Sequence, residues 1–180
     1  NWDKDLLSLF NVPQYLLPQV KNCIDDFGVT DPQYFGASIP IKAVAGDQQA
    51  AAIGQFCLTP KSCKITYGTG CFVIQNTGNK PVVSSHQLIT TVGYVINNQV
   101  SYALEGSIFV AGATIQWLRD ALRLIDRSED SELIAKQLDH TSGVYLVPAF
   151  TGLGAPYWDP QARGAILGLT RETGLEHIVR

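Results

Sequence analysis

The spacing of apolar residues changes twice along the chain, and these changes limit what it can fold into. After Pro60, apolar and polar residues alternate with the period of two that is typical of β-strands. The alternating runs are residues 62–67, 71–76, 88–96 and 100–104. From Val110 to Ile125 the period becomes 3.6, as in a helix with one apolar face. We therefore expect an α/β fold in which an antiparallel β-meander is followed by helices.

The connections between these runs contain residues that favour tight turns. Gly68, Thr69 and Gly70 separate the first two runs, and Asn97 and Asn98 separate the last two. Glycine and asparagine tolerate the positive φ angles of hairpin turns. Beyond the amphipathic helix, the pattern predicts a second helix over residues 128–138 and short strands over residues 144–147 and 165–169.

The first 60 residues have weaker patterns. Apolar clusters interrupted by Pro13 and Pro18 predict brief helical turns at residues 5–10 and 15–20, and residues 25–36 predict a loop. Residues 39–45 predict a buried strand, and the alanine-rich residues 48–56 predict a helix. Asp47 would then lie at a junction between strand and helix.

Charge and composition exclude several classes of protein. The 180 residues include 13 basic and 16 acidic ones, a net charge of -3, so we expect no nucleic-acid partner. No run approaches the roughly 18 consecutive apolar residues of a membrane span, so we expect no insertion into a membrane. No leader of the secretory type is recognisable, which favours the cytoplasm. Because the chain begins with Asn1 and contains no Met, we interpret it as an internal piece of a longer protein.

Charged residues are scarce in the middle of the chain. Between residues 48 and 118 they are only Lys61, Lys64, Lys80 and Glu105. This stretch is therefore expected to face a ligand or another part of a protein. The four cysteines, Cys23, Cys57, Cys63 and Cys71, form no C-x-x-C pair, so we expect reduced, mostly buried thiols and no metal site.

Two places could carry chemistry. Asp47 could act as a general base at the end of a strand, or it could simply cap the following helix. The amides of the turn Gly68-Thr69-Gly70 could approach phosphate oxygens, since glycine has no Cβ in the way, although an ordinary tight turn has the same composition.

A third candidate is the pair Gly112 and Gln116, which are one helical turn apart. They could contact a ligand, or serve only as a packing glycine and a solvated glutamine. Phe72 and Trp117 are, taken alone, more typical of a core.

Taken together, these segments closely resemble glycerol kinases of the FGGY carbohydrate kinase family. The resemblance runs from about residue 39 to the end of the chain, in matching order and spacing. The segments are GDQQAA (46–51), TYGTGCF (66–72), YALEG (102–106), GATIQWLRD (112–120) and PAFTGLGAPYWDP (148–160).

The resemblance implies a ribonuclease-H-like fold of the actin, Hsp70 and sugar kinase superfamily. Residues 1–58 would be the last part of the family's N-terminal domain and residues 59–180 the first part of its C-terminal domain. The chain would thus span the seam between two domains that close over the substrates.

The resemblance also implies roles for individual residues. Asp47 would take the proton from glycerol, and Gln48 and Phe72 would line the glycerol site. The nucleotide would be contacted by Gly68, Thr69, Gly112 and Gln116.

The implied reaction is the phosphorylation of glycerol to sn-glycerol 3-phosphate by ATP, with Mg²⁺ bridging the phosphates. We expect ATP or ADP and glycerol as ligands, a homo-oligomer when the protein is full-length, and no activity of the 180-residue chain alone. The alternatives are another kinase of the family, acting on xylulose or gluconate, and a noncatalytic nucleotide-binding module like the actin-related proteins.

Overall fold

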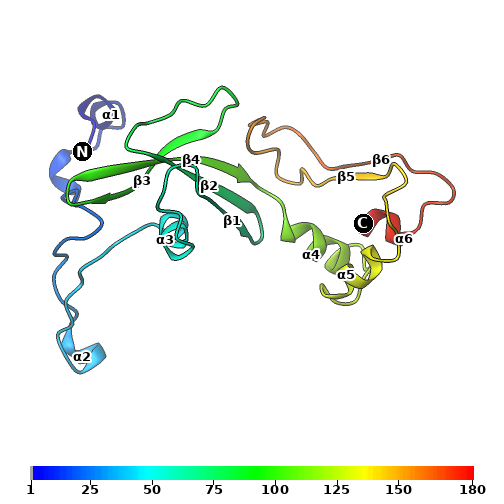
Figure 1. Ribbon diagram of the computed structural model, residues 1–180, viewed down its shortest axis with the longest axis horizontal. Helices are drawn as coiled ribbons and strands as arrows, with labels where there is room; N and C mark the ends of the chain where they lie inside the picture. The colour runs from blue at the N-terminus through cyan, green and yellow to red at the C-terminus, as the bar shows by residue number, and fades with distance from the viewer. Residues whose placement is uncertain (1) are drawn as a thin grey trace.

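Four antiparallel strands in the middle of the chain form the main sheet, and the C-terminal segments lie together to one side of it (Figure 1). The computed structural model describes residues 2–180. The strands are β1 (Cys63–Tyr67), β2 (Cys71–Gly78), β3 (Ile89–Ile96) and β4 (Gln99–Ile108), in the order β1-β2-β4-β3.

The strand order differs from the predicted meander, which would place β3 beside β2. Instead β4 pairs with both β2 and β3. Residues 79–88 connect β2 to β3 and leave between them the space that β4 occupies. Burial explains the order, because β4 carries small residues such as Ser101, Ala103 and Ser107 that are buried in the centre of the sheet. No residue of β3 is buried, as is typical of an edge strand.

The two predicted hairpin turns are confirmed. Tyr67 pairs with Cys71 across the turn of residues 68–70, and Ile96 pairs with Gln99 across Asn97 and Asn98. The two asparagines have φ angles of 50° and 60°. Positive φ at both central residues is the geometry that two-residue hairpin turns favour.

The sheet has two different faces. Helix α3 (Asp47–Gly54) packs against β1 and β2 on the face that we call the α3 face, which carries Lys64, Thr66, Phe72, Ile74 and Ser107. These residues share a face because side chains alternate along a strand and paired residues point the same way. The chain just after α3 is tied to β2, since Asn76 Nδ2 donates to the Cys57 carbonyl at 3.0 Å.

The segments before α3 are short and exposed. They are α1 (Lys4–Leu9), the 3-10 turn η1 (Gln14–Leu16) and α2 (Pro32–Phe35). The first two confirm the brief helical turns, whereas α2 lies within the predicted loop. The Asp31 carboxylate caps it by accepting from the Gln33 amide at 2.9 Å, and Gly36 ends it at φ 72°.

The prediction of a buried strand at residues 39–45 is wrong. These residues are extended and pair in isolated bridges with residues 24 and 29, but all seven are exposed. Ile39 and Val44 are 48% and 52% exposed. The ladder is tied to β3 through Cys23, whose amide donates to the Val95 carbonyl at 2.8 Å, but this contact leaves residues 39–45 exposed. A strand is buried only when layers cover its faces.

The C-terminal part contains α4 (Gly112–Asp120), α5 (Asp130–Ala135), β5 (Tyr145–Val147), β6 (Ala165–Leu167) and α6 (Leu175–Val179). All except α6 were expected, but both expected helices are shorter than predicted. Leu118 is 1% exposed, as its place on the apolar face predicts, whereas Leu122 is 41% exposed. The chain leaves the helix because Arg123 has a φ of 53°, in the left-handed region.

The four cysteines are free thiols, but only Cys57 and Cys71 are buried. Cys63 is exposed and Cys23 is half-buried, so the expectation of mostly buried thiols holds for two of them. Among the described residues, 2–180, no helix has both the length and the apolar character needed to span a bilayer.

Candidate functional site

Asp47 is the first residue of α3 and its side chain is exposed. Gly46 occupies the N-cap position, so Asp47 is not the cap that the alternative interpretation required. Its carboxylate oxygen Oδ1 accepts a hydrogen bond from the Gln48 amide at 2.8 Å. This bond orients the carboxylate at the start of the helix while leaving it open to solvent, where it can accept a proton.

Gln48 is tied to the sheet by hydrogen bonds to β1. Its side-chain oxygen Oε1 accepts from the ammonium of Lys64 and, at 3.5 Å, from the hydroxyl of Thr66. Lys64 Nζ also donates to Thr66 Oγ1 at 2.6 Å. Three side chains from α3 and β1 therefore form one hydrogen-bonded cluster on the α3 face.

Phe72 lies beside this cluster. It is the cross-strand partner of Thr66 between β1 and β2, and it also pairs with Ser107 of β4. Directly paired residues in antiparallel strands have Cβ atoms about 5 Å apart on the same face. The structure thus brings Gln48 and Phe72, both predicted to line the glycerol site, to the same face of the sheet.

The turn after β1 is bonded to the start of α4. The carbonyl of Gly68 accepts from the Gly112 amide at 2.9 Å, and the carbonyl of Thr69 accepts from the amides of Ala111 and Ala113 at 2.8 Å and 3.2 Å. The structure therefore brings together three of the four residues expected to contact the nucleotide, namely Gly68, Thr69 and Gly112.

These bonds also determine which groups near the turn remain free to donate a hydrogen bond to a phosphate. The first amides of α4 are occupied by the turn carbonyls and cannot donate elsewhere. Within residues 2–180, the Thr69 amide donates to no protein acceptor, and its side chain is exposed. Gln116, one helical turn beyond Gly112, is also exposed.

Strand β1 connects the two groups of predicted site residues. Thr66 belongs to the cluster around Gln48, and Thr69 lies three residues further along the chain. At about 3.3 Å per residue, this places the two at most about 10 Å apart.

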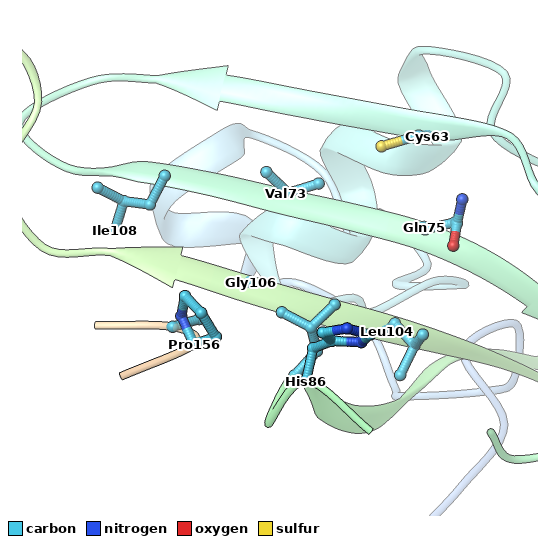
Figure 2. A pocket seen from close by; sticks show the side chains of 10 residues that line it. Cys63, Val73, Gln75, His86, Leu104, Gly106, Ile108 and Pro156 are labelled. Carbon is cyan, nitrogen blue, oxygen red and sulfur yellow. The ribbon is translucent and has the colours of Figure 1, made fainter. Parts of the chain in front are cut away.

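The opposite face of the sheet holds a hollow of about 340 Å³, shown in Figure 2. It is lined mainly by apolar groups of β2, β4 and the loops around residues 86 and 156. The lining residues are Cys63, Val73, Gln75, His86, Leu88, Leu104, Gly106, Ile108, Ala155 and Pro156. None of them is among the predicted site residues, so this hollow and the candidate site lie on different faces.

Cys63 at the rim of this hollow has a raised pKa. Burial contributes most, the neighbouring Cys57 contributes further, and the positive charge of Lys64 acts in the opposite direction. In the described part of the chain, no three side chains of the metal-binding types gather in one place.

Sequence reasoning missed the role of Lys64 in the cluster. The lysine was noticed only as one of the few charges in the middle of the chain. The sequence did contain one signal for this role. Lys64 and Thr66 are two residues apart in a predicted strand, so their side chains are expected to point to the same face. Nothing in the sequence indicated that this face is the one covered by α3.

Comparison with known proteins places the chain among sugar kinases. Residues 63–180 match the FGGY family of carbohydrate kinases, C-terminal domain. Glycerol kinase 1 of Pseudomonas aeruginosa is 62% identical over 179 residues, which are 99% of this chain and 36% of that protein. Glycerol kinase of Ectopseudomonas mendocina is 61% identical over 178 residues, again 36% of its length.

Solved structures give the same result. The crystal structure of Plasmodium falciparum glycerol kinase with ADP is 41% identical and superposes with a TM-score of 0.87, over 99% of this chain and 36% of that one. A ligand-bound xylulose kinase from Lactobacillus acidophilus superposes with a TM-score of 0.82 at 22% identity, which shows a common fold. The chain spans 36% of the length of the relatives named here, apart from the 37% that it spans of the xylulose kinase.

Proposed function

The chain belongs to the FGGY family of carbohydrate kinases, and from this premise we propose that a protein carrying it transfers phosphate from ATP to glycerol. Its fold is the expected one of the actin, Hsp70 and sugar kinase superfamily. The observation that carries the choice of glycerol is the identity of 62% to a glycerol kinase over 99% of the chain. Identity to the xylulose kinase of L. acidophilus is only 22%.

We assign the acceptor side of the reaction to the start of α3. Asp47, exposed at the first position of the helix, would take the proton of the terminal hydroxyl of glycerol as that oxygen attacks the phosphorus. Gln48 and Phe72 would border the glycerol. The assignment is supported by Thr66, which donates to Gln48 of α3 and is the cross-strand partner of Phe72.

We assign the phosphate side to the turn between β1 and β2. The Thr69 amide and hydroxyl would donate hydrogen bonds to phosphate oxygens, and Gly68, Gly112 and Gln116 would lie along the nucleotide. The bonds between the turn and α4 support this, because they hold the turn in one conformation before the nucleotide arrives. Positioning and charge stabilisation provide most of the catalysis in such transfers.

MgATP is the proposed second substrate. Mg²⁺ would arrive with the nucleotide, where it neutralises phosphate charge. The steps assigned above are those of this chain's own residues, and none of these residues is assigned as a ligand of the ion. The domain boundary between residues 58 and 59, the homo-oligomeric state and the cytoplasmic location stay predictions.

The test is a comparison of acceptors with a full-length protein carrying this sequence. Glycerol, xylulose and gluconate would each be supplied with MgATP, and the phosphorylated product identified by mass spectrometry. We expect kcat/KM to be highest for glycerol. Preference for xylulose or gluconate would support another activity of the family, and nucleotide binding without transfer to any acceptor would support a noncatalytic module.

A further inference from the structure

Lys64 is a charged residue in an unusual position. It is 4% exposed, and it forms no salt bridge with any carboxylate among residues 2–180. Lysine is almost never fully buried unless it is paired, because removing an ammonium from water is costly. A buried lysine without an ion partner is therefore expected to serve a purpose other than stability.

The contacts of Lys64 indicate that purpose. Its ammonium donates to Gln48 Oε1 and to Thr66 Oγ1, so it links the first turn of α3 to β1. An ammonium can donate hydrogen bonds but cannot accept them. It can therefore hold the oxygen end of the Gln48 carboxamide and not the nitrogen end.

This selection fixes the direction of the Gln48 side chain. With Oε1 held by Lys64, the NH₂ group at the other end of the carboxamide is directed away from the ammonium and has two donors available for a ligand. A hydroxylated acceptor offers oxygen atoms that accept such bonds. Without Lys64, the carboxamide could rotate and present either end.

We propose that Lys64 is a positioning residue for the acceptor. It orients the carboxamide of Gln48, next to Asp47, and holds the start of α3 against the strand that leads to the Thr69 turn. This inference rests on the proposed function, because it assumes that the acceptor binds beside Gln48. Lys64 itself is not proposed to touch either substrate.

A double-mutant cycle in a full-length protein carrying this sequence tests the proposal. The variants are Lys64→Met, Gln48→Ala and the double variant, with Lys80→Met as the matched control because Lys80 is exposed on the loop after β2. We expect Lys64→Met to raise the KM for glycerol about tenfold, the size expected for losing a charged hydrogen bond, with less than about a twofold change in the KM for MgATP.

The cycle separates coupling from independent damage. In the Gln48→Ala background, Lys64→Met is expected to raise the KM for glycerol by less than about twofold, because the carboxamide that it orients is gone. Equal effects of Lys64→Met in both backgrounds would overturn the proposal. Lys80→Met is expected to leave both KM values unchanged.

Thermal unfolding distinguishes positioning from a structural role. Lys64→Met removes a buried charge that has no ion partner, and Thr66 Oγ1 can still donate to Gln48 Oε1, so we expect the Tm of this variant to be unchanged or higher. A lower Tm together with parallel losses in both KM values and kcat would overturn the proposal. If Lys64→Met does not fold, the cycle is repeated with Lys64→Leu, which also lacks a hydrogen-bond donor; an unchanged KM for glycerol would then overturn the proposal.

Failure of the proposed function has a different signature. If the parent protein prefers xylulose or gluconate, the choice of glycerol is wrong, and the same cycle measured with the preferred acceptor tests Lys64. If the parent transfers phosphate to no acceptor, both proposals are overturned. An active parent whose variants show no coupling overturns the inference about Lys64 alone.

Discussion

The amide nitrogen of Gly112 lies 2.9 Å from the carbonyl oxygen of Gly68, so the first residue of α4 is bonded directly to the hairpin turn that precedes β2. This contact is possible only because residue 112 has no side chain. A Cβ added there would lie 2.6 Å from the same carbonyl oxygen, closer than such atoms approach. The position of the turn therefore depends on this glycine.

We expect Gly112→Ala to destabilise a full-length protein by about 1–3 kcal/mol, the usual cost of forcing an extra methyl group into a packed contact. The KM for MgATP should rise as well, because the turn must shift. Urea unfolding and steady-state kinetics measure the two effects. The control is Gly54→Ala in α3, where a Cβ meets no atom within 4 Å, and it should be neutral or slightly stabilising.

Thr69 allows a test of the turn that does not disturb its backbone. Thr69→Ala removes an exposed hydroxyl while keeping the carbonyl that accepts from Ala111 and Ala113. We expect the KM for MgATP to rise about tenfold, as for the loss of a hydrogen bond to a charged group, with an unchanged Tm. Thr69→Ser keeps the hydroxyl and should remain within about twofold of the parent. An equal effect of both substitutions would argue against phosphate contact through this hydroxyl.

Asp47→Asn tests the general base. The substitution keeps the shape of the side chain but removes its ability to take a proton, so kcat should fall by roughly 10²–10⁴ with a smaller change in the KM for glycerol. Asp139→Asn, at an exposed carboxylate far along the chain, is the control and should have normal kcat. A near-normal kcat for Asp47→Asn would remove Asp47 from the proton transfer.

The turns and element types could be predicted from the sequence because their causes are local. Asn97 and Asn98 adopt the positive φ angles that a two-residue hairpin turn favours. Neither Gly68 nor Gly70 has a positive φ; at residue 70 glycine is needed because an added Cβ would lie 2.6 Å from the Ile108 carbonyl oxygen. The order of strands could not be predicted in this way. Alternation tells which residues share a face, but it does not tell whether β3 or β4 lies next to β2.

The errors have the same origin. Residues 39–45 have the composition of a buried strand, but their burial depends on which other segments pack on them. The sequence of these seven residues does not determine that. The residues of the proposed site were found through a resemblance that covers several segments at once. Lys64 was overlooked because a single lysine in a strand is usually an exposed one.

The raised pKa of Cys63 predicts slow alkylation. Its thiol should stay protonated at pH values where an ordinary cysteine begins to ionise, and only the thiolate reacts. The pH at which iodoacetamide reacts at half its maximal rate should therefore lie above that of a model cysteine peptide, as measured by peptide mass spectrometry. Lys64→Met should move this pH higher still, because the positive charge of Lys64 lowers the pKa of Cys63. A midpoint below that of the model peptide would contradict the prediction.

The strand order β1-β2-β4-β3 has a consequence for how the protein folds. The β3–β4 hairpin closes across two residues, whereas β2 pairs with β4 across residues 79–98, which include the loop after β2 and the whole of β3, as in the pair Ile74 and Glu105. Contacts between distant residues form late, because a long loop must close first. We therefore expect the β3–β4 hairpin to form first and β2 to pair afterwards with the free edge of β4. A slip of one residue at that step would exchange the two faces of β2 and carry Phe72 to the wrong side of the sheet.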